Sequence, residues 1–225
     1  MNFDFTKYFK EYEKIVAMSD NAFDRVKKEY SDYVKCKIKC SDCCHALFDL
    51  TLIEALYINH HFNIKFQGTQ QREDLLKKAD NADRKTYMLK KKAYKESESG
   101  KDTSEILAGL SLERVECPML DNEEKCDIYD YRPITCRVYG IPTSIYERGH
   151  TCGRSGFKQG DSYPTIKLDI IQKKLYEISA NLVADLNTKH TSMADILVPL
   201  SMAILTDYTE QYLGIETNKK QGADS

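Results

Sequence analysis

The sequence contains no tryptophan, and it has only 10 glycines and 5 prolines among its 225 residues. An all-β protein with many turns needs more of both, because glycine and proline supply the backbone angles of turns. No segment approaches the run of about 20 apolar residues that crosses a membrane. The first residues alternate aromatic and charged side chains and lack the apolar stretch of a secretory signal. We therefore expect a helix-rich protein of the cytoplasm with no membrane partner.

An excess of charge of one sign is also missing. The formal net charge is −2, from 33 Lys and Arg against 35 Asp and Glu, so the whole chain is not drawn to nucleic acid or to anionic lipid. The most basic segment is 84–95, where Lys and Arg alternate with Tyr87 and Tyr94, and such a helix is able to contact nucleic acid. Acidic residues lie in the same segment and around it, which favours a solvated helix face. We therefore expect no nucleic-acid partner.

Apolar residues recur at spacings of three and four, which is typical of amphipathic helices. This pattern predicts long helices over residues 5–33, 69–98, 171–186 and 192–213, and a short helix over residues 103–114. Ser19-Asp20-Asn21 interrupts the first stripe, where it would break the helix or cap a second one. The predicted fold is mostly α, with long helices packed around a loop-rich core.

Local signals predict several helix ends. Thr51 and Glu54 form a capping-box signature before an apolar run, which predicts a helix start. Pro199 predicts a kink or a fresh start within the last helix, and Gly214 predicts its end. Residues 216–225 are polar and predict a flexible tail. Residues 1–215 are expected to form one helical domain around a cysteine core at residues 36–154.

Eight cysteines are the most reactive feature of the chain. Four lie close together and four follow a long gap: Cys36, Cys40, Cys43, Cys44, Cys117, Cys126, Cys136 and Cys152. In a reducing cytoplasm such cysteines are metal ligands or redox thiols. The alternative is a set of four disulfides in an exported chain, which the missing signal segment disfavours. The sequence also lacks a P-loop, a nucleophile elbow and a dinucleotide-binding fingerprint.

The first four cysteines cannot serve one ion from a straight helix. Cys36 and Cys43 would lie about 10.5 Å apart at a rise of 1.5 Å per residue. Sulfur ligands of one zinc ion, each about 2.3 Å from it, lie within about 4 Å of each other. A turn around Cys40-Ser41-Asp42-Cys43 is therefore predicted, because Ser and Asp favour turns.

The adjacent pair Cys43-Cys44 suggests that the two halves of the chain share a site. Neighbouring side chains diverge in helices and strands, so the pair suits two metals or two edges of one cluster. We therefore expect ligands from both cysteine regions to mix. The alternative is that one of the two cysteines is a buried free thiol.

The second cysteine region, 115–165, is rich in loops and holds four of the five prolines, so ligation of a metal would order it. Four thiolates on one zinc ion or one oxidised four-iron cluster leave a net charge of about −2. Nearby cations would stabilise these thiolates: Lys35, Lys37, Lys39, Arg132, Arg137 and Arg154. His45 and His150 stand beside cysteines, where each is expected to support the ligands or to replace one.

The cysteine segments resemble a known family. The segments CKIKCSDCCH, CPML, CDIYDYRPITCRVYG and HTCG look like those of the YkgJ-like cysteine-cluster family, also called CxxCxxCC, whose members are described as chelators of zinc or iron. The likeness covers about residues 36–154, although the first gap here is three residues rather than two. It implies a bacterial cytoplasmic protein in which the eight cysteines bind the metal, Cys152 being the least securely matched. Arg132, Pro133 and Arg137 match the family's RP-x-x-CR core.

Two functions follow from these observations. The first is a metal-binding protein that holds an iron–sulfur cluster, with 4Fe-4S favoured, or Zn²⁺; the adjacent pair and the irregular spacings favour the cluster. The alternative is a metal-dependent protein-modifying enzyme, because flagellin lysine methylases carry a similar cysteine cluster. A protein partner fits either function, and neither has an assigned substrate.

Overall fold

A computed structural model describes residues 3–37, 39–158 and 160–215 of the chain. The protein is mostly α-helical, as predicted. The helices are α1 (Thr6–Glu29), α2 (Leu52–Phe66), α3 (Gln70–Glu98), α4 (Thr103–Leu112), α5 (Ile134–Val138), α6 (Leu168–Leu186) and α7 (Leu200–Leu205). The strands are β1 (Asp49–Leu50), β2 (Thr143–Ile145), β3 (Arg148–His150), β4 (Ile166–Lys167) and β5 (Val198–Pro199). None of the described helices is long and apolar enough to cross a membrane.

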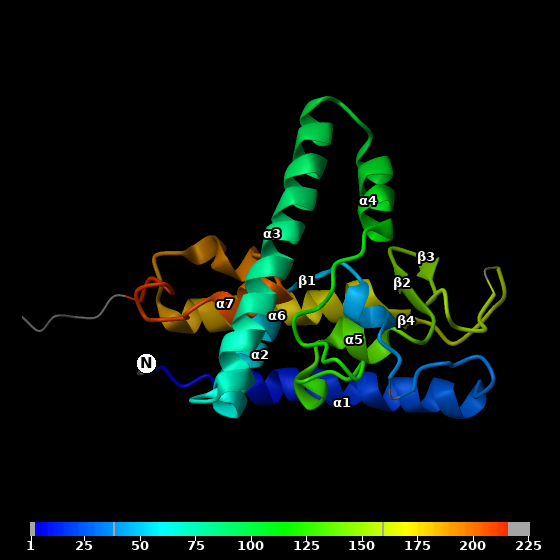
Figure 1. The fold of residues 1–225 in the computed structure, drawn as a ribbon, viewed down its shortest axis with the longest axis horizontal. Helices are drawn as coiled ribbons and strands as arrows, with labels where there is room; N and C mark the ends of the chain where they lie inside the picture. The colour runs from blue at the N-terminus through cyan, green and yellow to red at the C-terminus, as the bar shows by residue number, and fades with distance from the viewer. Residues whose placement is uncertain (1–2, 38, 159, 216–225) are drawn as a thin grey trace, which may run out of the picture.

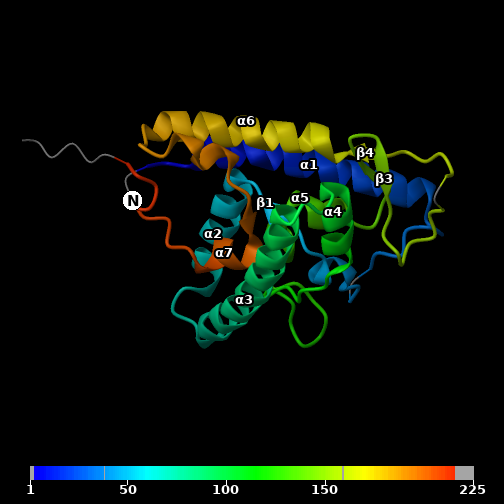
Figure 2. The same ribbon diagram turned by 90° about the horizontal axis from the view of Figure 1, so that it is seen from above.

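Two long helices form the base of the molecule. Helices α1 and α6 pack against each other and run in opposite directions along its length (Figures 1 and 2). Helix α1 does not break at Ser19, because this side chain is buried and its hydroxyl donates to the Ile15 carbonyl at 2.8 Å. The hydroxyl therefore has a partner inside the helix, and the predicted interruption is absent.

Helix α2 lies at the centre of the main hydrophobic core. Every residue from Leu52 to Asn59 is buried, which is expected of a helix that is apolar on nearly all sides. The predicted capping box is present at its start, where the Glu54 carboxylate accepts the Thr51 N–H at 3.2 Å. The Asn59 amide donates to the Ala203 carbonyl at 2.9 Å, which fixes α7 against α2.

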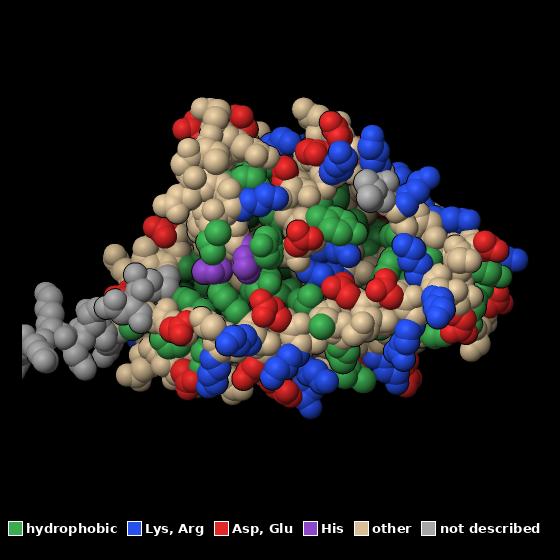
Figure 3. Space-filling view, turned by 90° about the horizontal axis from the view of Figure 1, so that it is seen from below, with side chains coloured by type: hydrophobic (Ala, Val, Ile, Leu, Met, Phe, Trp, Pro, Cys, Tyr) green, Lys and Arg blue, Asp and Glu red, His purple; other side chains and the backbone are tan. Residues whose placement is uncertain are grey.

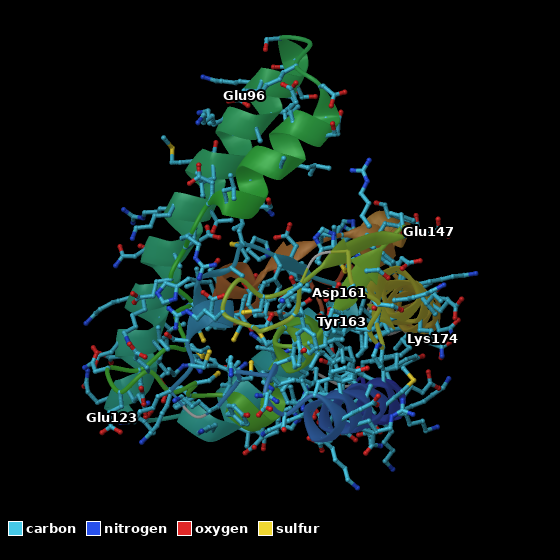
Figure 4. The ribbon with its side chains drawn as sticks, turned by 90° about the vertical axis from the view of Figure 1, so that its right-hand side faces the viewer. Glu96, Glu123, Glu147, Asp161, Tyr163 and Lys174 are labelled. Carbon is cyan, nitrogen blue, oxygen red and sulfur yellow. The ribbon has the colours of Figure 1, made fainter. Side chains whose placement is uncertain are left out.

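Helices α3 and α4 form an antiparallel arm that stands away from the body (Figure 1). Both helices were predicted, and each begins at a side-chain cap: Thr69 accepts the Arg72 N–H, and Asp102 accepts two N–H groups of α4. Glu96 lies near the free end of the arm, where it pairs with Lys101 at 2.8 Å (Figure 4). Lys90, in the basic segment, pairs with Asp49 of the body at 2.7 Å.

Charges of both signs alternate on the surface. In Figure 3 acidic and basic side chains are interspersed around a hollow that is lined mainly by hydrophobic side chains, with histidines among them. His61 stacks on Tyr131 with ring centroids 3.8 Å apart, which joins α2 to the second cysteine region. No large patch of one sign covers the face that Figure 3 shows.

The predicted long helix over residues 192–213 is wrong as one element, although the fresh start predicted at Pro199 is confirmed, because α7 begins at Leu200. Residues Thr191–Asp195 form a 3₁₀ helix, β5 follows, and α7 ends at Leu205. The residue before a proline favours an extended backbone, and Val198 is extended here and pairs with Leu50 of β1. Gly214 does not end a helix; its φ is +67°, and a Cβ there would lie 2.4 Å from the His190 ring. The predicted tail at 216–225 lies outside the described residues.

A small sheet, which was not predicted, organises the second cysteine region. Its strand order is β3-β2-β4: β2 pairs with β3 antiparallel, with Thr143 opposite His150, and with β4 parallel, with Thr143 opposite Ile166. The sheet closes the loop between residues 150 and 166. Periodicity did not reveal these strands because each is only two or three residues long.

Candidate metal centre

The first cysteine stretch is a loop rather than a straight helix. Lys39 adopts a left-handed backbone with φ +71°, and a 3₁₀ helix, η1, follows over Asp42–His45. The Cys40 N–H donates to the Lys37 carbonyl and the Cys44 N–H to the Ser41 carbonyl, both at 2.9 Å. These tight turns bring Cys40, Cys43 and Cys44 closer together than an extended chain would.

The two cysteine regions meet through the backbone. The Cys117 N–H donates to the Cys44 carbonyl at 2.7 Å. From Cys117 the chain forms a tight hairpin, in which the Asp127 N–H donates to the Met119 carbonyl at 2.8 Å. The Asp121 carboxylate closes its turn by accepting the Lys125 N–H at 2.7 Å. The hairpin places Cys126 next to Cys117.

Seven of the eight thiols line one cavity of about 550 Å³. They are Cys36, Cys40, Cys43, Cys44, Cys117, Cys126 and Cys136. The eighth, Cys152, is buried outside the lining, with its thiol 3.5 Å from Oδ2 of Asp42. All eight cysteines are free thiols. The structure therefore brings together residues that lie a hundred positions apart in the chain.

Burial and hydrogen bonds shift the pKa values of these thiols in opposite directions. Hydrogen bonds from the Cys136 and Cys44 thiols lower the pKa of Cys43, and the Arg132 guanidinium lowers it further. Burial raises the pKa of Cys117 to about 12 and that of Cys126 to about 11. Cys43 is thus the thiol that is best stabilised as a thiolate before any metal binds.

Three of the cysteines share one local geometry. The sulfur of each lies within reach of the backbone N–H two residues further on: Met119 for Cys117, Ile128 for Cys126 and Arg154 for Cys152. The backbone nitrogen of Arg154 lies 3.4 Å from the Cys152 sulfur. Such N–H groups stabilise a thiolate without a competing charge, and hydrogen bonds to sulfur tune metal centres.

The two arginines of the RP-x-x-CR segment act differently. Arg132 lies over the Tyr129 ring at 4.0 Å, and its charge favours the thiolates of Cys43 and Cys126, although burial still raises the pKa of Cys126. Its buried Nε has no hydrogen-bond partner among the described residues. Arg137 instead binds Asp20 of α1 at 2.7 Å and the Arg132 carbonyl at 2.9 Å, so it fastens the segment to the helices.

Neither predicted histidine lines the cavity. Nδ1 of His45 donates to the Ser41 carbonyl at 3.0 Å, which supports the turn that carries Cys43 and Cys44. His150 is exposed on β3, and its carbonyl accepts the Thr143 hydroxyl. Lys37 and Lys39 lie at the cavity, as their positions in the sequence suggested.

Sequence reasoning missed three residues around the thiols. Asp42 lies between Cys40 and Cys43, and its carboxylate faces Cys152. Gly140 follows Cys136 in the segment CRVYG, and a Cβ there would lie 2.2 Å from the sulfur of Cys36. Glu54 accepts the Ile134 N–H at 3.1 Å and so holds the start of α5, which carries Cys136. The first two stand within the cysteine motifs, whereas only the fold joins Glu54 to them.

The thiols surround a volume and do not meet at a point. Among the residues that the structure describes, no three Cys, His, Asp or Glu side chains converge as the ligands of a single ion do. The donor set is nevertheless soft, because seven thiols and no histidine line the cavity. Thiolates of this kind select zinc, copper(I) or iron–sulfur clusters over magnesium or calcium. The residues therefore fit a thiolate-bound metal group.

The fold and the site define a helical protein with a thiol-lined cavity, which is the class of cysteine-rich metal-binding proteins. The family described as "CxxCxxCC: Putative zinc- or iron-chelating domain" matches residues 35–153, and the chain belongs to this family. The match confirms the resemblance read from the cysteine segments. No curated protein and no solved structure matched the chain.

Proposed function

We propose that this protein holds an iron–sulfur cluster through its cysteines, with 4Fe-4S favoured over Zn²⁺. One observation carries the proposal: seven thiols line a cavity of about 550 Å³ without converging on one point. A single zinc ion needs sulfur atoms within about 4 Å of each other. A polynuclear cluster places its metals some distance apart and accepts ligands from several sides, which suits thiols spread around a cavity.

The chain's own residues would hold and tune the group. Cys43, Cys117 and Cys126 would supply thiolates, and the N–H groups of Met119 and Ile128 would donate to two of these sulfurs. Arg132 would offset part of the negative charge. When bound, a cluster supplies one-electron transfer or a Lewis acid, whereas zinc supplies a Lewis acid or a structural cross-link.

The test is purification without oxygen, followed by an optical spectrum and measurement of iron, zinc and acid-labile sulfide per chain. We expect a brown protein with visible absorption and with iron and sulfide in equal amounts. A colourless protein with stoichiometric zinc and no sulfide would overturn the iron–sulfur assignment and leave zinc binding. A protein with no metal at all would overturn metal binding itself.

A second candidate function is a metal-dependent enzyme that modifies proteins, as the likeness to flagellin lysine methylases implied. The observation that favours it is the size of the cavity, which falls in the range of small-ligand sites. Apolar side chains from α3 and α7, among them Ala82 and Leu200, form a wall beside the cysteines. Such a wall leaves room for a substrate next to the metal.

Two variants would separate these functions. Thr86→Phe would fill part of the cavity beside the apolar wall without replacing a cysteine. If the protein is an enzyme, the variant should abolish the lysine methylation that depends on it, measured by mass spectrometry, while the metal content stays unchanged. Cys43→Ser should lose metal in either case. Equal methylation in cells with and without the gene would dismiss the enzyme.

We also propose a reducing, cytoplasmic location, which the eight free thiols support. A protein partner is proposed as well, because it fits either function.

A further inference from the structure

The outer part of the arm, residues 88–112, contributes neither to the thiol cavity nor to the hydrophobic core. The α3 residues that line the cavity end at Thr86, and none of residues 88–112 belongs to either hydrophobic cluster of the described chain. Both helices of the arm are nevertheless capped, and they extend away from the body (Figure 1). This ordered projection is therefore free to contact another molecule.

A groove on the outer part of α3 carries unpaired positive charge. It is lined by Met88, Lys91, Lys92, Lys95, Glu96 and Ser99, and we call it the lysine groove. Its three lysines have no carboxylate at ion-pair distance among the residues that the structure describes. Its one acid, Glu96, is already held by Lys101 at 2.8 Å. The groove thus presents three ammonium groups and no unpaired carboxylate.

Exposed apolar side chains accompany these charges. Met88 is 64% exposed, and Tyr87 and Tyr94 on the same part of α3 are 59% and 64% exposed. Methionine adapts its shape to irregular partners, and tyrosine and methionine are enriched where proteins meet. Apolar side chains with charged ones around them are the usual composition of a protein-binding surface.

The lysine groove faces away from the thiol cavity. Met88 follows Thr86 by two residues, which places it about 200° further round the helix. The lining residues recur at spacings of three and four, so they form one stripe, about 16 Å long from Met88 to Ser99. A stripe of this kind suits the face of an amphipathic helix or a short extended segment. A segment docked there would leave the cavity open.

We propose that the lysine groove binds an acidic, amphipathic segment of a partner protein. Charge complementarity selects this occupant, because its carboxylates would pair with Lys91, Lys92 and Lys95 while an apolar side chain covers Met88. The inference names the chemistry of the protein partner proposed above. It does not depend on which metal the cysteines hold.

Two observations favour a protein over a nucleic acid. Nζ of Lys91 lies over the Tyr87 ring at 5.7 Å, so one face of this ring is not open to a stacking base. Glu96 and Glu98 stand at the outer end of α3, where their charges would repel phosphates.

A fluorescent peptide tests the proposal on the full chain. The peptide has about 14 residues, about 21 Å as a helix, with glutamate on one side and leucine on the other. A second peptide has serine in place of each leucine, and fluorescence anisotropy gives the Kd of both. We expect the leucine peptide to bind at least about tenfold more tightly, because its apolar side chains are buried. Its affinity should fall as the salt concentration rises from about 0.05 to about 0.5 M.

Two triple variants locate the binding. Lys91→Glu, Lys92→Glu and Lys95→Glu together should weaken binding of the leucine peptide at least about tenfold. The matched control reverses Lys10, Lys14 and Lys174, which are exposed lysines without an ion pair among the described residues. Lys174 lies on the body, away from the arm (Figure 4). The control should keep the affinity within about twofold, because salt screens distant charges.

The outcomes are distinct. No binding of the leucine peptide, or equal weakening in both triple variants, would overturn the proposal. Tighter binding of single-stranded RNA or of phosphatidylserine vesicles through the same lysines would also overturn it. So would a dimer that dissociates in the Lys91, Lys92 and Lys95 variant, seen by analytical ultracentrifugation, because a second copy would then fill the groove. If the reversed variant does not fold, glutamine at the same three positions replaces it.

Metal content is measured on the same samples. It should be equal in the unchanged chain and in both triple variants, because the groove lies outside the thiol cavity. Peptide binding by a protein without metal would overturn only the proposed metal function. A metal-bound protein that ignores the peptide would overturn only the lysine groove.

Discussion

At the scale of single residues, Glu54 shows how a buried carboxylate serves the thiol region. It lies inside the protein, accepts the Thr51 N–H at 3.2 Å and accepts the Ile134 N–H at 3.1 Å. One oxygen caps α2 and the other holds the start of α5, which carries Cys136. The side chain therefore joins the main core to the RP-x-x-CR segment.

Replacing Glu54 by alanine should destabilise the protein strongly. The change leaves two buried N–H groups without an acceptor, at a cost of about 1–3 kcal/mol for each. Urea unfolding would measure the loss in the free energy of unfolding. Glu98→Ala, which removes an exposed carboxylate at the end of α3, is the control and should change stability little. A similar small effect for both variants would contradict this role of Glu54.

The pH dependence of stability should also report on Glu54. Burial raises the pKa of this carboxyl above 4.5 in the folded protein, so the folded state holds the proton more tightly than the unfolded state. This contribution to stability is fully present below the pKa of the carboxyl in the unfolded chain. It is lost as the pH rises from that value through the raised pKa of the folded protein. Compared with Glu54→Gln, the unfolding free energy of the unchanged protein should fall over this window. Parallel pH profiles would contradict the shift.

At the scale of elements, one ion pair fastens α5 to α1. The Arg137 side chain is 6% exposed and binds Asp20 at 2.7 Å. Asp20 lies in α1, within the segment Ser19-Asp20-Asn21 where the sequence predicted an interruption. The pair joins the first long helix to the segment that carries Cys136. It is better buried than the pair of Lys7 with Asp185, whose side chains are 65% and 54% exposed.

Asp20→Ala should therefore cost more than Lys7→Ala. The first change leaves a buried guanidinium without its partner, which costs about 2 kcal/mol or more; Asp20 reaches solvent, so the loss stays below that of a fully buried pair. The second change removes an exposed pair worth under about 1 kcal/mol. Thermal unfolding of both variants compares them directly. Equal melting temperatures of the two variants would show that the pair of Arg137 with Asp20 adds no more to stability than the exposed pair of Lys7 with Asp185.

The arm of α3 and α4 is the element that we expect to open first. Exposed apolar side chains, including Met88, Tyr94 and Leu107, show how little of its outer part is packed. Segments with few buried contacts exchange their amide hydrogens through local opening. Hydrogen exchange measured by mass spectrometry should therefore be faster over residues 88–112 than over α2. Equal protection of both would mean that a partner or a second copy covers the arm.

At the scale of the whole molecule, the metal should decide how well the cysteine loops are ordered. Residues 115–165 contain only short helices and strands. Few backbone hydrogen bonds join them to the first cysteine stretch. The main core is built largely from apolar side chains of α1, α2, α6 and α7. The helices and the loops therefore depend on the metal to different degrees.

Removal of the metal by a chelator should lower the melting temperature and keep most of the helical signal. A ligand present at 100 times its Kd stabilises by about 2.7 kcal/mol, which is a shift of about 5–10 °C for a protein of this size. Circular dichroism and differential scanning calorimetry measure the two effects. Complete loss of helix on chelation would show that the main core does not hold without the metal.

Particular residues show which features could be predicted. The helix over 69–98 was predicted because its whole apolar stripe lies within one continuous segment. The helix over 192–213 was predicted wrongly because its apolar spacing is helical while Val198 is held extended by Leu50, which lies far away in the chain. The small sheet was missed because its strands are only two or three residues long and its parallel pair joins the distant residues 143 and 166.

The sequence by itself determined the helical class, the family and the thiol chemistry, because periodicity, caps and cysteine spacing are local properties. Tertiary structure alone decided which thiols face one another. The Cys117 N–H meets the Cys44 carbonyl, and Cys152 meets Asp42, only after distant segments have packed on two separate hydrophobic clusters. The gathering of seven thiols around one cavity is thus a consequence of long-range packing, which no local pattern in the sequence records.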